Sequence, residues 1–209
     1  MDILRKTIMK IQRVQIKAIL LVVAIMLGGG ISYYYYHQKN NHVYAHSIID
    51  FDYNRDAQDI MQLMKDNWYW LIAETKKDAP ADLSKFNVEH MLRTKSPNDY
   101  NPEYFGKLNI RVMRDKEGFK GFVAYYKKSF YKGQLLFIAV SKQFRERGYG
   151  KILAQYVLDE FKRMGVFRVR LITRVDNLPA QAVYKKLGFK QVWTDGTYLD
   201  FEVLLDKQN

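Results

Sequence analysis

Residues 140–151 read Val-Ser-Lys-Gln-Phe-Arg-Glu-Arg-Gly-Tyr-Gly-Lys and join two segments of different character. The segment before them, residues 135–140 (LLFIAV), is apolar throughout, as is typical of a central strand covered on both faces. The segment after them, residues 150–164, places four apolar side chains on one helical face: Leu153, Val157, Phe161 and Met164. Because Gly165 ends that helix, residues 140–151 are predicted to turn from a buried strand into a helix.

This turn has the features of an anion-binding site. Backbone amides in the first turn of a helix have no partner within the helix, and the helix dipole adds partial positive charge there. Gly148 and Gly150 let a diphosphate approach the backbone closely, and three basic side chains add charge: Arg145, Arg147 and Lys151. The alternative is a plain helix start with solvated basic side chains. The spacing matches neither the G-x-x-x-x-G-K-[ST] phosphate loop nor the G-x-G-x-x-G dinucleotide motif.

A second informative stretch, residues 177–189, reads Asn-Leu-Pro-Ala-Gln-Ala-Val-Tyr-Lys-Lys-Leu-Gly-Phe. The first stretch resembles the acetyl-CoA motif of the GNAT superfamily of N-acetyltransferases, with its R/Q-x-x-G-x-G/A core. The second is similar to that family's N-x-x-A-x-x-x-Y-x-x-x-G-F motif. Both stand in the family's order, and the resemblance covers about residues 46–205. It implies the GNAT fold, a mixed α/β (α+β) architecture with a central mixed, splayed sheet.

The pattern of apolar residues and turn signals predicts the order β-α-α-β-β-β-α-β-α-β-β. Asn54 looks like the cap of a long first helix at residues 55–74, and a shorter helix follows at 86–93. Pro179 opens a last helix, which Gly188 closes. The expected strands are residues 46–53, 108–114, 119–127, 134–140, 166–173, 189–192 and 198–205.

The resemblance implies a role for residues of both motifs. Backbone groups of Ile138, Ala139 and Val140 would face the pantetheine arm of acetyl-CoA. Asn177 would reach that arm too, although its other reading is a cap for the helix that follows. Tyr184 would protonate the leaving thiolate; its other reading is an ordinary packed tyrosine, in a chain that has 16. The pyrophosphate would lie on the turn, at Arg145, Glu146, Arg147, Gly148, Tyr149, Gly150 and Lys151.

The chain departs from the family pattern at three positions. Lys142 stands where the family often has Pro and Glu146 where it often has Gly, and neither change removes a backbone amide that the motif needs. Ile172 stands five residues before Asn177, where some members carry the glutamate that serves as general base. Residues 134–140 contain no carboxylate either. The base is therefore left open between ordered water and three acidic residues: Asp176, Asp200 and Glu202.

The N-terminal part is predicted to anchor the chain in a membrane. Residues 1–13 are basic, and we interpret residues 14–36, which end in four tyrosines, as one transmembrane helix. Residues 37–45 would be a linker, followed by the acetyltransferase domain at 46–205 and a tail at 206–209. A buried core helix and a cleaved signal peptide are the alternatives.

The side of the membrane on which the domain lies stays open. Five basic residues precede residue 18 against Asp2 alone, which predicts a cytoplasmic N-terminus and places residues 37–209 across the membrane. Acetyl-CoA is normally a cytosolic metabolite, so its supply argues for a cytosolic domain instead.

Composition narrows the chemistry. The 209 residues include no cysteine, which excludes disulfides, zinc–thiolate sites, iron–sulfur clusters and thiol catalysis. The four histidines show no metal-ligand spacing, so no metal is expected. The net charge of +12 suggests an acidic partner, but beyond residue 17 there is no run of five or six like charges and no nucleic-acid motif.

Three functions fit these observations. The first is an N-acetyltransferase that moves acetyl from acetyl-CoA to a primary amine of a small molecule, peptide or protein. The second is a CoA-binding domain of the same fold whose acyl-transfer chemistry is lost or altered. The third is a basic, membrane-associated binding module. Since no thiol can carry an acyl intermediate, direct attack in a ternary complex is the simpler mechanism for the first.

Overall fold

The computed structural model describes residues 48–72, 76–77, 79–82, 84–96 and 107–206, all within the second of two units, His46–Asn209. The predicted basic segment, transmembrane helix and linker lie outside the described residues. Within the described ranges, no helix is both long and apolar enough to span a membrane.

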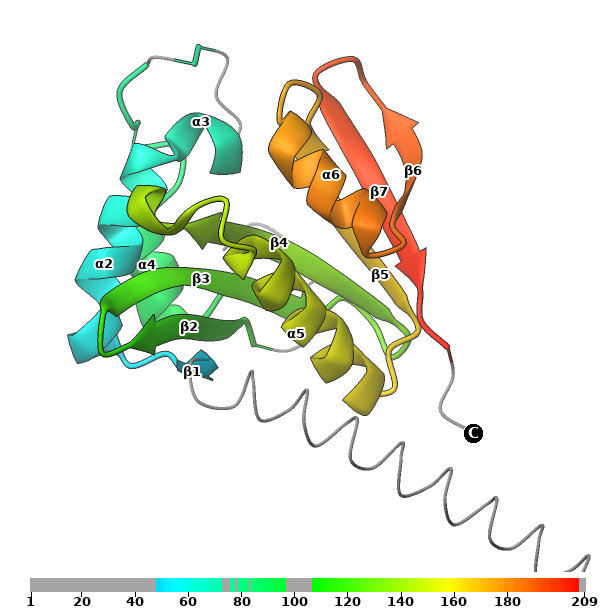
Figure 1. Ribbon diagram of the computed structural model, residues 1–209, viewed down its shortest axis with the longest axis horizontal. Coiled ribbons are helices and arrows are strands. Elements are labelled where there is room, and N and C mark those ends of the chain that lie inside the picture. Colours follow the sequence, from blue (N-terminus) through cyan, green and yellow to red (C-terminus); the bar gives the residue numbers. More distant parts are fainter. Residues whose placement is uncertain (1–47, 73–75, 78, 83, 97–106, 207–209) are drawn as a thin grey trace, which may run out of the picture. The chain divides into compact units, whose positions relative to one another are not determined.

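Seven strands form one mixed sheet in the order β1-β2-β3-β4-β5-β7-β6 (Figure 1). Neighbouring strands are antiparallel except β4 and β5, which are parallel and connected through a helix. This topology confirms the predicted mixed α/β fold. The strands are β1 (Ile48–Asp50), β2 (Asn109–Asp115), β3 (Gly118–Lys127), β4 (Lys132–Val140), β5 (Arg168–Arg174), β6 (Lys190–Thr194) and β7 (Tyr198–Leu204).

Helices cover both faces of the sheet and create two apolar cores (Figure 1). β3 lies between these cores, because Val123 and Tyr125 pack on the side of α5 and α6 while Phe122 and Ala124 pack on the side of α2 and α4. The helices are α2 (Tyr53–Asp66), α3 (Trp68–Leu71), α4 (Val88–Thr94), the 3₁₀ turn η1 (Lys142–Phe144), α5 (Tyr149–Arg163) and α6 (Leu178–Lys186).

The long first helix predicted at residues 55–74 is in fact two helices. Asp52, and not Asn54, is the N-cap, and its carboxylate accepts the amide of Arg55 at 2.9 Å. The helix ends at Asn67, whose side-chain amide donates to Leu63 O at 2.7 Å. The apolar periodicity continues past Asn67 into α3, so the sequence pattern does not reveal the break.

β4 and β5 separate soon after they meet. Their parallel pairing covers three residue pairs and ends at Gln134 and Arg170. The register of β4 against β3 then shifts around Leu136, a β-bulge that bends a strand locally. The remainder of β4 therefore diverges from β5, and the predicted splay of the sheet lies at this point.

Candidate active site

The loop between β4 and α5 contains two left-handed residues. Glu146 has a φ of 63° and Gly148 a φ of 82°, and Gly148 is the N-cap of α5. The first hydrogen bond into the helix runs from Ile152 N to Gly148 O at 3.1 Å, so the amides of residues 149–151 have no helical acceptor. Outward-facing amides at the positive end of a 15-residue helix suit an anion such as a diphosphate.

The positive φ of Glu146 explains why the family often has glycine at this position, and it makes the glutamate a strained departure from that pattern. A left-handed conformation costs a non-glycine residue about 1–2 kcal/mol, whereas glycine adopts it freely. The family's frequent glycine is therefore the unstrained choice at this position. Glu146 adopts the left-handed conformation that glycine would adopt here, at the cost of strain. The glutamate therefore does not prevent the loop from turning at this residue.

The side chain of Arg145 holds the loop in place. Its Nε donates to Val140 O at 3.1 Å, and its Nη2 donates to Asn67 Oδ1 at 2.7 Å. Asn67 is 8% exposed and lies where α2 meets α3. Arg147 and Lys151 are exposed, so they are the basic side chains of the loop that remain available to a phosphate.

Lys120 on β3 adds a buried positive charge that the sequence analysis did not single out. It is 4% exposed, and its Nζ donates to the hydroxyl of Tyr149 at 3.1 Å and to Glu117 at 3.0 Å. Its hydrogen bond to Asp115 raises the pKa of the Lys120 ammonium, which stays charged at neutral pH. The one sequence signal for this group is a lone lysine inside the apolar strand GFKGFVAYY.

The three predicted residues of β4 lie beyond the point where β5 separates. Ala139 is buried, and Ile138 and Val140 are half-buried against the core on the side of α5 and α6. Because the ladder to β5 ends at Gln134, the edge of these residues that faces β5 has no neighbouring strand, and Val140 O accepts from Arg145 Nε instead. An extended, amide-bearing arm could pair with that edge.

Tyr184 on α6 is a packed residue of the core. It is 5% exposed, and its ring centroid lies 5.9 Å from that of Phe189 and 6.2 Å from that of Phe201. Burial raises the pKa of the Tyr184 hydroxyl above its ordinary value of 10.0, so this group keeps its proton at neutral pH. A protonated hydroxyl is the state that can donate to a leaving thiolate.

Asn177 caps α6. Its side-chain oxygen accepts the backbone amide of Ala180 at 3.4 Å, and its backbone amide donates to Arg174 O at 3.1 Å. In this structure Asn177 therefore acts as the N-cap of α6. A role in holding the donor would use the other end of its side-chain amide.

The carboxylates considered as bases are all engaged. Asp200 is 7% exposed and forms an ion pair with Arg170. Its Oδ1 also accepts a hydrogen bond from Arg170 Nε at 3.2 Å. Glu202 lies 3.5 Å from Arg168. Asp176 accepts the Tyr69 hydroxyl at 2.6 Å, a bond that lowers the pKa of this carboxyl.

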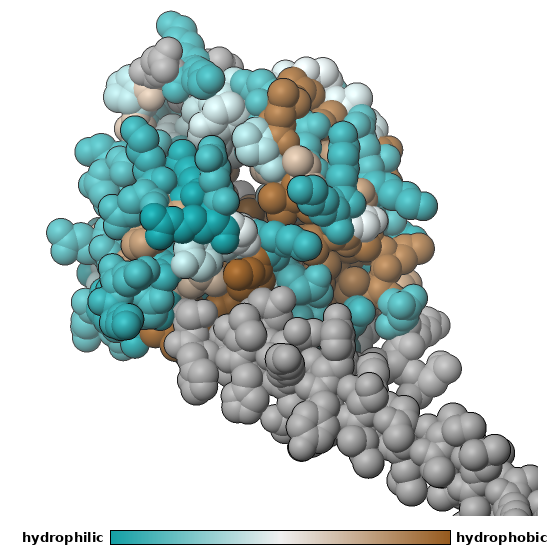
Figure 2. Space-filling model, viewed as in Figure 1, coloured by the Kyte–Doolittle hydropathy of each residue, from teal (hydrophilic) through white to brown (hydrophobic). Residues whose placement is uncertain are grey.

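Several large apolar side chains are exposed on the C-terminal part of the domain. Ile172, at the position of the missing glutamate, is 60% exposed. Figure 2 shows hydrophobic residues gathered over the part of the molecule that carries α6, β6 and β7, while the part around α2 is mostly hydrophilic. Exposed large apolar residues in this C-terminal part are Ile172, Val175, Leu178, Val192, Trp193 and Leu204.

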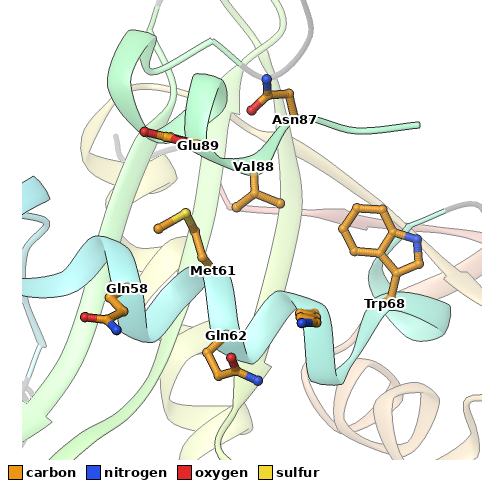
Figure 3. Close-up of a pocket in the computed structure, with 8 residues that line it drawn as sticks. Gln58, Met61, Gln62, Trp68, Asn87, Val88 and Glu89 are labelled. Atoms are coloured by element: carbon orange, nitrogen blue, oxygen red, sulfur yellow. The ribbon is translucent and has the colours of Figure 1, made fainter. Parts of the chain in front are cut away.

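A separate pocket of about 460 Å³ lies between α2 and α4 (Figure 3). Met61 and Gln62 line it from α2, Val88 lines it from α4, and Trp68 closes one end. None of the residues that line it belongs to the β4–α5 loop or to α6. In the described part of the chain, no group of three or more histidine or acidic side chains could hold a metal ion.

A mixed sheet that separates between β4 and β5, beside a helix start with unpartnered amides, is the arrangement expected of an acyl-CoA-binding α/β fold. A sequence model of the acetyltransferase (GNAT) family matches residues 58–189, more than half of the chain. The chain therefore belongs to the GNAT acetyltransferase family.

Curated relatives match a shorter segment. A [ribosomal protein bS18]-alanine N-acetyltransferase of Salmonella typhimurium is 39% identical over 54 residues, which are 26% of this chain and 36% of that protein. An N-alpha-acetyltransferase of Sulfurisphaera tokodaii is 44% identical over 62 residues, 29% of this chain and 37% of that protein. A mycothiol acetyltransferase of Corynebacterium jeikeium is 33% identical over 66 residues, 32% of this chain and 19% of that protein. These matches thus span about a third of the relatives' length or less.

Solved structures share the fold. The PaiA N-acetyltransferase of Thermoplasma acidophilum, determined in complex with coenzyme A, superposes with a TM-score of 0.60 at 20% identity, over 75% of this chain and 97% of that one. The ribosomal-protein-S18-alanine N-acetyltransferase of Escherichia coli gives 0.55 at 17% identity, over 78% and 96%. At this level of identity the likeness concerns the fold alone.

Proposed function

We propose that this protein is an N-acetyltransferase that moves acetyl from acetyl-CoA to a primary amine by direct attack in a ternary complex. The observation that carries the proposal is the gap between β4 and β5, which opens beside the free amides at the start of α5. Family membership and the relatives' names support the same activity.

The residues around the gap fit an acyl-CoA donor. The amides of residues 149–151, with the exposed Arg147 and Lys151, would bind the pyrophosphate, and Lys120, which is paired with Asp115 and Glu117, would position the Tyr149 hydroxyl beside them. The edge at residues 138–140 would hydrogen-bond to the amides of the pantetheine arm through the groups other than Val140 O, which accepts from Arg145. These contacts would place the thioester carbonyl deep in the gap.

The reaction balances without a covalent enzyme intermediate. The amine nitrogen attacks the thioester carbonyl carbon, and the carbon–sulfur bond breaks as the C–N bond forms. The hydroxyl of Tyr184 donates its proton to the leaving sulfur, and the new ammonium gives up a proton to ordered water, because Asp176 is engaged by Tyr69 and Arg174. Tyr184 then recovers a proton from solvent, and the products are an N-acetyl amide and CoA.

The acceptor is a primary amine of a small molecule, a peptide or a protein. Several relatives carry names that point to protein α-amino groups, and others are mycothiol acetyltransferases. An α-amino group has a pKa near 7.7–8.0, so about a tenth of it is already neutral at pH 7. We therefore put peptide N-termini first among the acceptors to test.

The test measures CoA release by the purified full-length protein with a thiol-reactive dye. Because the chain contains no cysteine, the protein itself gives no signal. The panel comprises peptides with free and blocked N-termini, polyamines and aminoglycosides. Release that requires both acetyl-CoA and a free amine supports the proposal, and absence of release with every amine would overturn it.

A second candidate is a CoA-binding domain without acetyl transfer. Ile172, exposed where some family members place a base, favours this candidate. Stabilisation of the protein by acetyl-CoA without release from any amine would support it. A protein that binds anionic vesicles or nucleic acid but is not stabilised by acetyl-CoA would instead fit a basic binding module.

We also propose that residues 14–36 anchor the protein in a membrane. The support is in the sequence, where residues 18–36 carry no charge and follow a basic segment. A reporter fused after Asn209, active on one side of the membrane only, tests both the anchor and its orientation. Recovery of the intact chain in the soluble fraction would refute the anchor.

A further inference from the structure

The short helix α3 contacts both sides of the gap between β4 and β5. On the β4 side, the carbonyl of Asn67 accepts the amides of Trp70 at 2.9 Å and Leu71 at 3.1 Å, which fixes the start of α3. The side chain of the same Asn67 accepts Arg145 of the phosphate-binding loop at 2.7 Å. Thus the first turn of α3 is attached directly to the loop that would hold the pyrophosphate.

On the β5 side, α3 contacts the turn that leads into α6. The Tyr69 hydroxyl donates to Asp176 Oδ2 at 2.6 Å, and the guanidinium of Arg174 lies 3.8 Å from the centre of the Tyr69 ring. Arg174 is 6% exposed and also donates to the hydroxyl of Tyr198 at 3.1 Å and to Asp176 Oδ1 at 3.3 Å. Tyr69 of α3 therefore contacts two residues, Arg174 and Asp176, on the β5 side of the gap.

The turn at residues 174–177 is also hydrogen-bonded to α6. The side chain of Gln181, 7% exposed, donates to Val175 O at 2.8 Å and to Arg174 O at 3.3 Å. Gln181 precedes Tyr184 by three residues, so the two lie one helical turn apart. A displacement of residues 174–177 would consequently move the first two turns of α6 and the hydroxyl proposed as the acid.

We propose that Tyr69 is a positioning residue: through Asp176 and Arg174 it fixes the turn before α6, and hence the place of Tyr184 relative to the phosphate-binding loop. The inference rests on the proposed acetyltransferase function but assigns a role to a residue outside both sequence motifs. The β4–α5 loop would hold the diphosphate of the donor, while Tyr184 on α6 would protonate the sulfur at the other end of the same molecule. The distance between the loop and α6 must therefore stay fixed. Small errors in such a separation slow the chemical step far more than they weaken binding.

The test uses Tyr69→Phe, which keeps the ring over Arg174 and removes the hydroxyl that bonds Asp176. We expect kcat to fall about tenfold, while the Kd for acetyl-CoA stays within about twofold. Hydrogen–deuterium exchange of the full-length protein should become several-fold faster at residues 175–182 and stay unchanged at 150–163. The chain offers a matched control in Tyr53→Phe, because Tyr53 also donates to a carboxylate, Glu89 at 3.0 Å, and lies 4.2 Å from the guanidinium of Arg93.

The outcomes separate this inference from the proposed function. If the wild type turns over and Tyr69→Phe keeps both its kcat and its exchange pattern, the positioning role is wrong. Equal losses in Tyr69→Phe and Tyr53→Phe would likewise refute it, since they would reflect general loosening. If the wild type transfers no acetyl group, the proposed function fails, and exchange at residues 175–182 alone decides whether Tyr69 holds the turn.

Discussion

Arg145 and Asn67, 78 positions apart in the chain, are joined by a hydrogen bond of 2.7 Å from the guanidinium to the side-chain amide oxygen. The bond gives a motif arginine a structural task, because Asn67 is buried at the junction of α2 and α3. A motif residue that looks like a phosphate ligand in the sequence is thus used to attach the loop to the rest of the fold.

Arg145→Ala should lower the free energy of unfolding by about 1–2 kcal/mol, because the oxygen of Asn67 is left buried without a donor. Arg147→Ala removes the same charge from the same loop, but the Arg147 guanidinium lies over the Phe144 ring and makes no hydrogen bond to the described residues, so stability should stay within about 0.5 kcal/mol. Urea unfolding of both variants measures the difference. Equal stability of the two would show that the Arg145 bond contributes nothing.

Glu146→Gly should stabilise the protein, by up to about 1 kcal/mol, because it relieves a positive φ of 63°. Lys116→Gly, in an exposed turn where φ is not positive, should instead destabilise it slightly through the greater freedom of the unfolded chain. Chemical denaturation of the pair gives the sign. Destabilisation by Glu146→Gly would mean that the left-handed conformation carries no strain.

Tyr184→Phe should reduce kcat by about a hundredfold or more and leave the Kd for acetyl-CoA nearly unchanged. Since burial raises the pKa of this hydroxyl above 10.0, the wild-type kcat should show no loss up to pH 9 from its ionisation. Steady-state rates from pH 6 to 9 test both statements. A variant with wild-type turnover would remove Tyr184 as the acid and leave it as a core residue.

Stability should fall in acid because of Asp56. This carboxyl is fully buried, which opposes ionisation, but hydrogen bonds from Arg55 and from the amide of Asp52 prevail and lower its pKa. A carboxyl with a lowered folded pKa stabilises the fold above its unfolded value of about 3.9, and that contribution is lost as the pH falls further. Thermal unfolding between pH 2.5 and 7 should show this loss.

The matched variant is Asp56→Asn. It should cost about 2 kcal/mol at pH 7, less than for a fully buried pair because Arg55 is partly exposed. Its Tm should also depend less on pH below 4 than that of the wild type. A pH dependence identical to the wild type would assign the acid loss to other carboxylates.

Local signals in the sequence carried most of the fold. The apolar runs, the turn signals between them, the apolar face of α5 and the glycine after it were sufficient to predict the order of elements, whereas the mixed sheet was implied by the family resemblance. The break at Asn67 was not predictable, since it depends on hydrogen bonds to Leu63 and to Arg145, and the second of these partners is remote in sequence.

The candidate site also has one part that the sequence predicts and one part that it does not. Its backbone part followed from motif spacing, because the positions of Gly148 and Gly150 relative to a helix start are a local property. The groups that support it, Lys120, Tyr69 and Arg174, come from three different elements and meet only in the folded chain. No pattern in a single sequence marks side chains that act on each other across a sheet.

The early separation of β4 and β5 leaves a strand edge in the interior of the protein. Proteins protect the outer edge strands of a sheet from pairing with other chains. An unpaired strand edge between two strands of the same sheet is accessible only to a narrow ligand. The pantetheine arm, with its two amides, would act there as a missing strand, so its binding would add to the stability of the fold. At a donor concentration of a hundred times Kd that gain would be about 2.7 kcal/mol, so the stability of the folded domain would depend on the supply of the proposed donor.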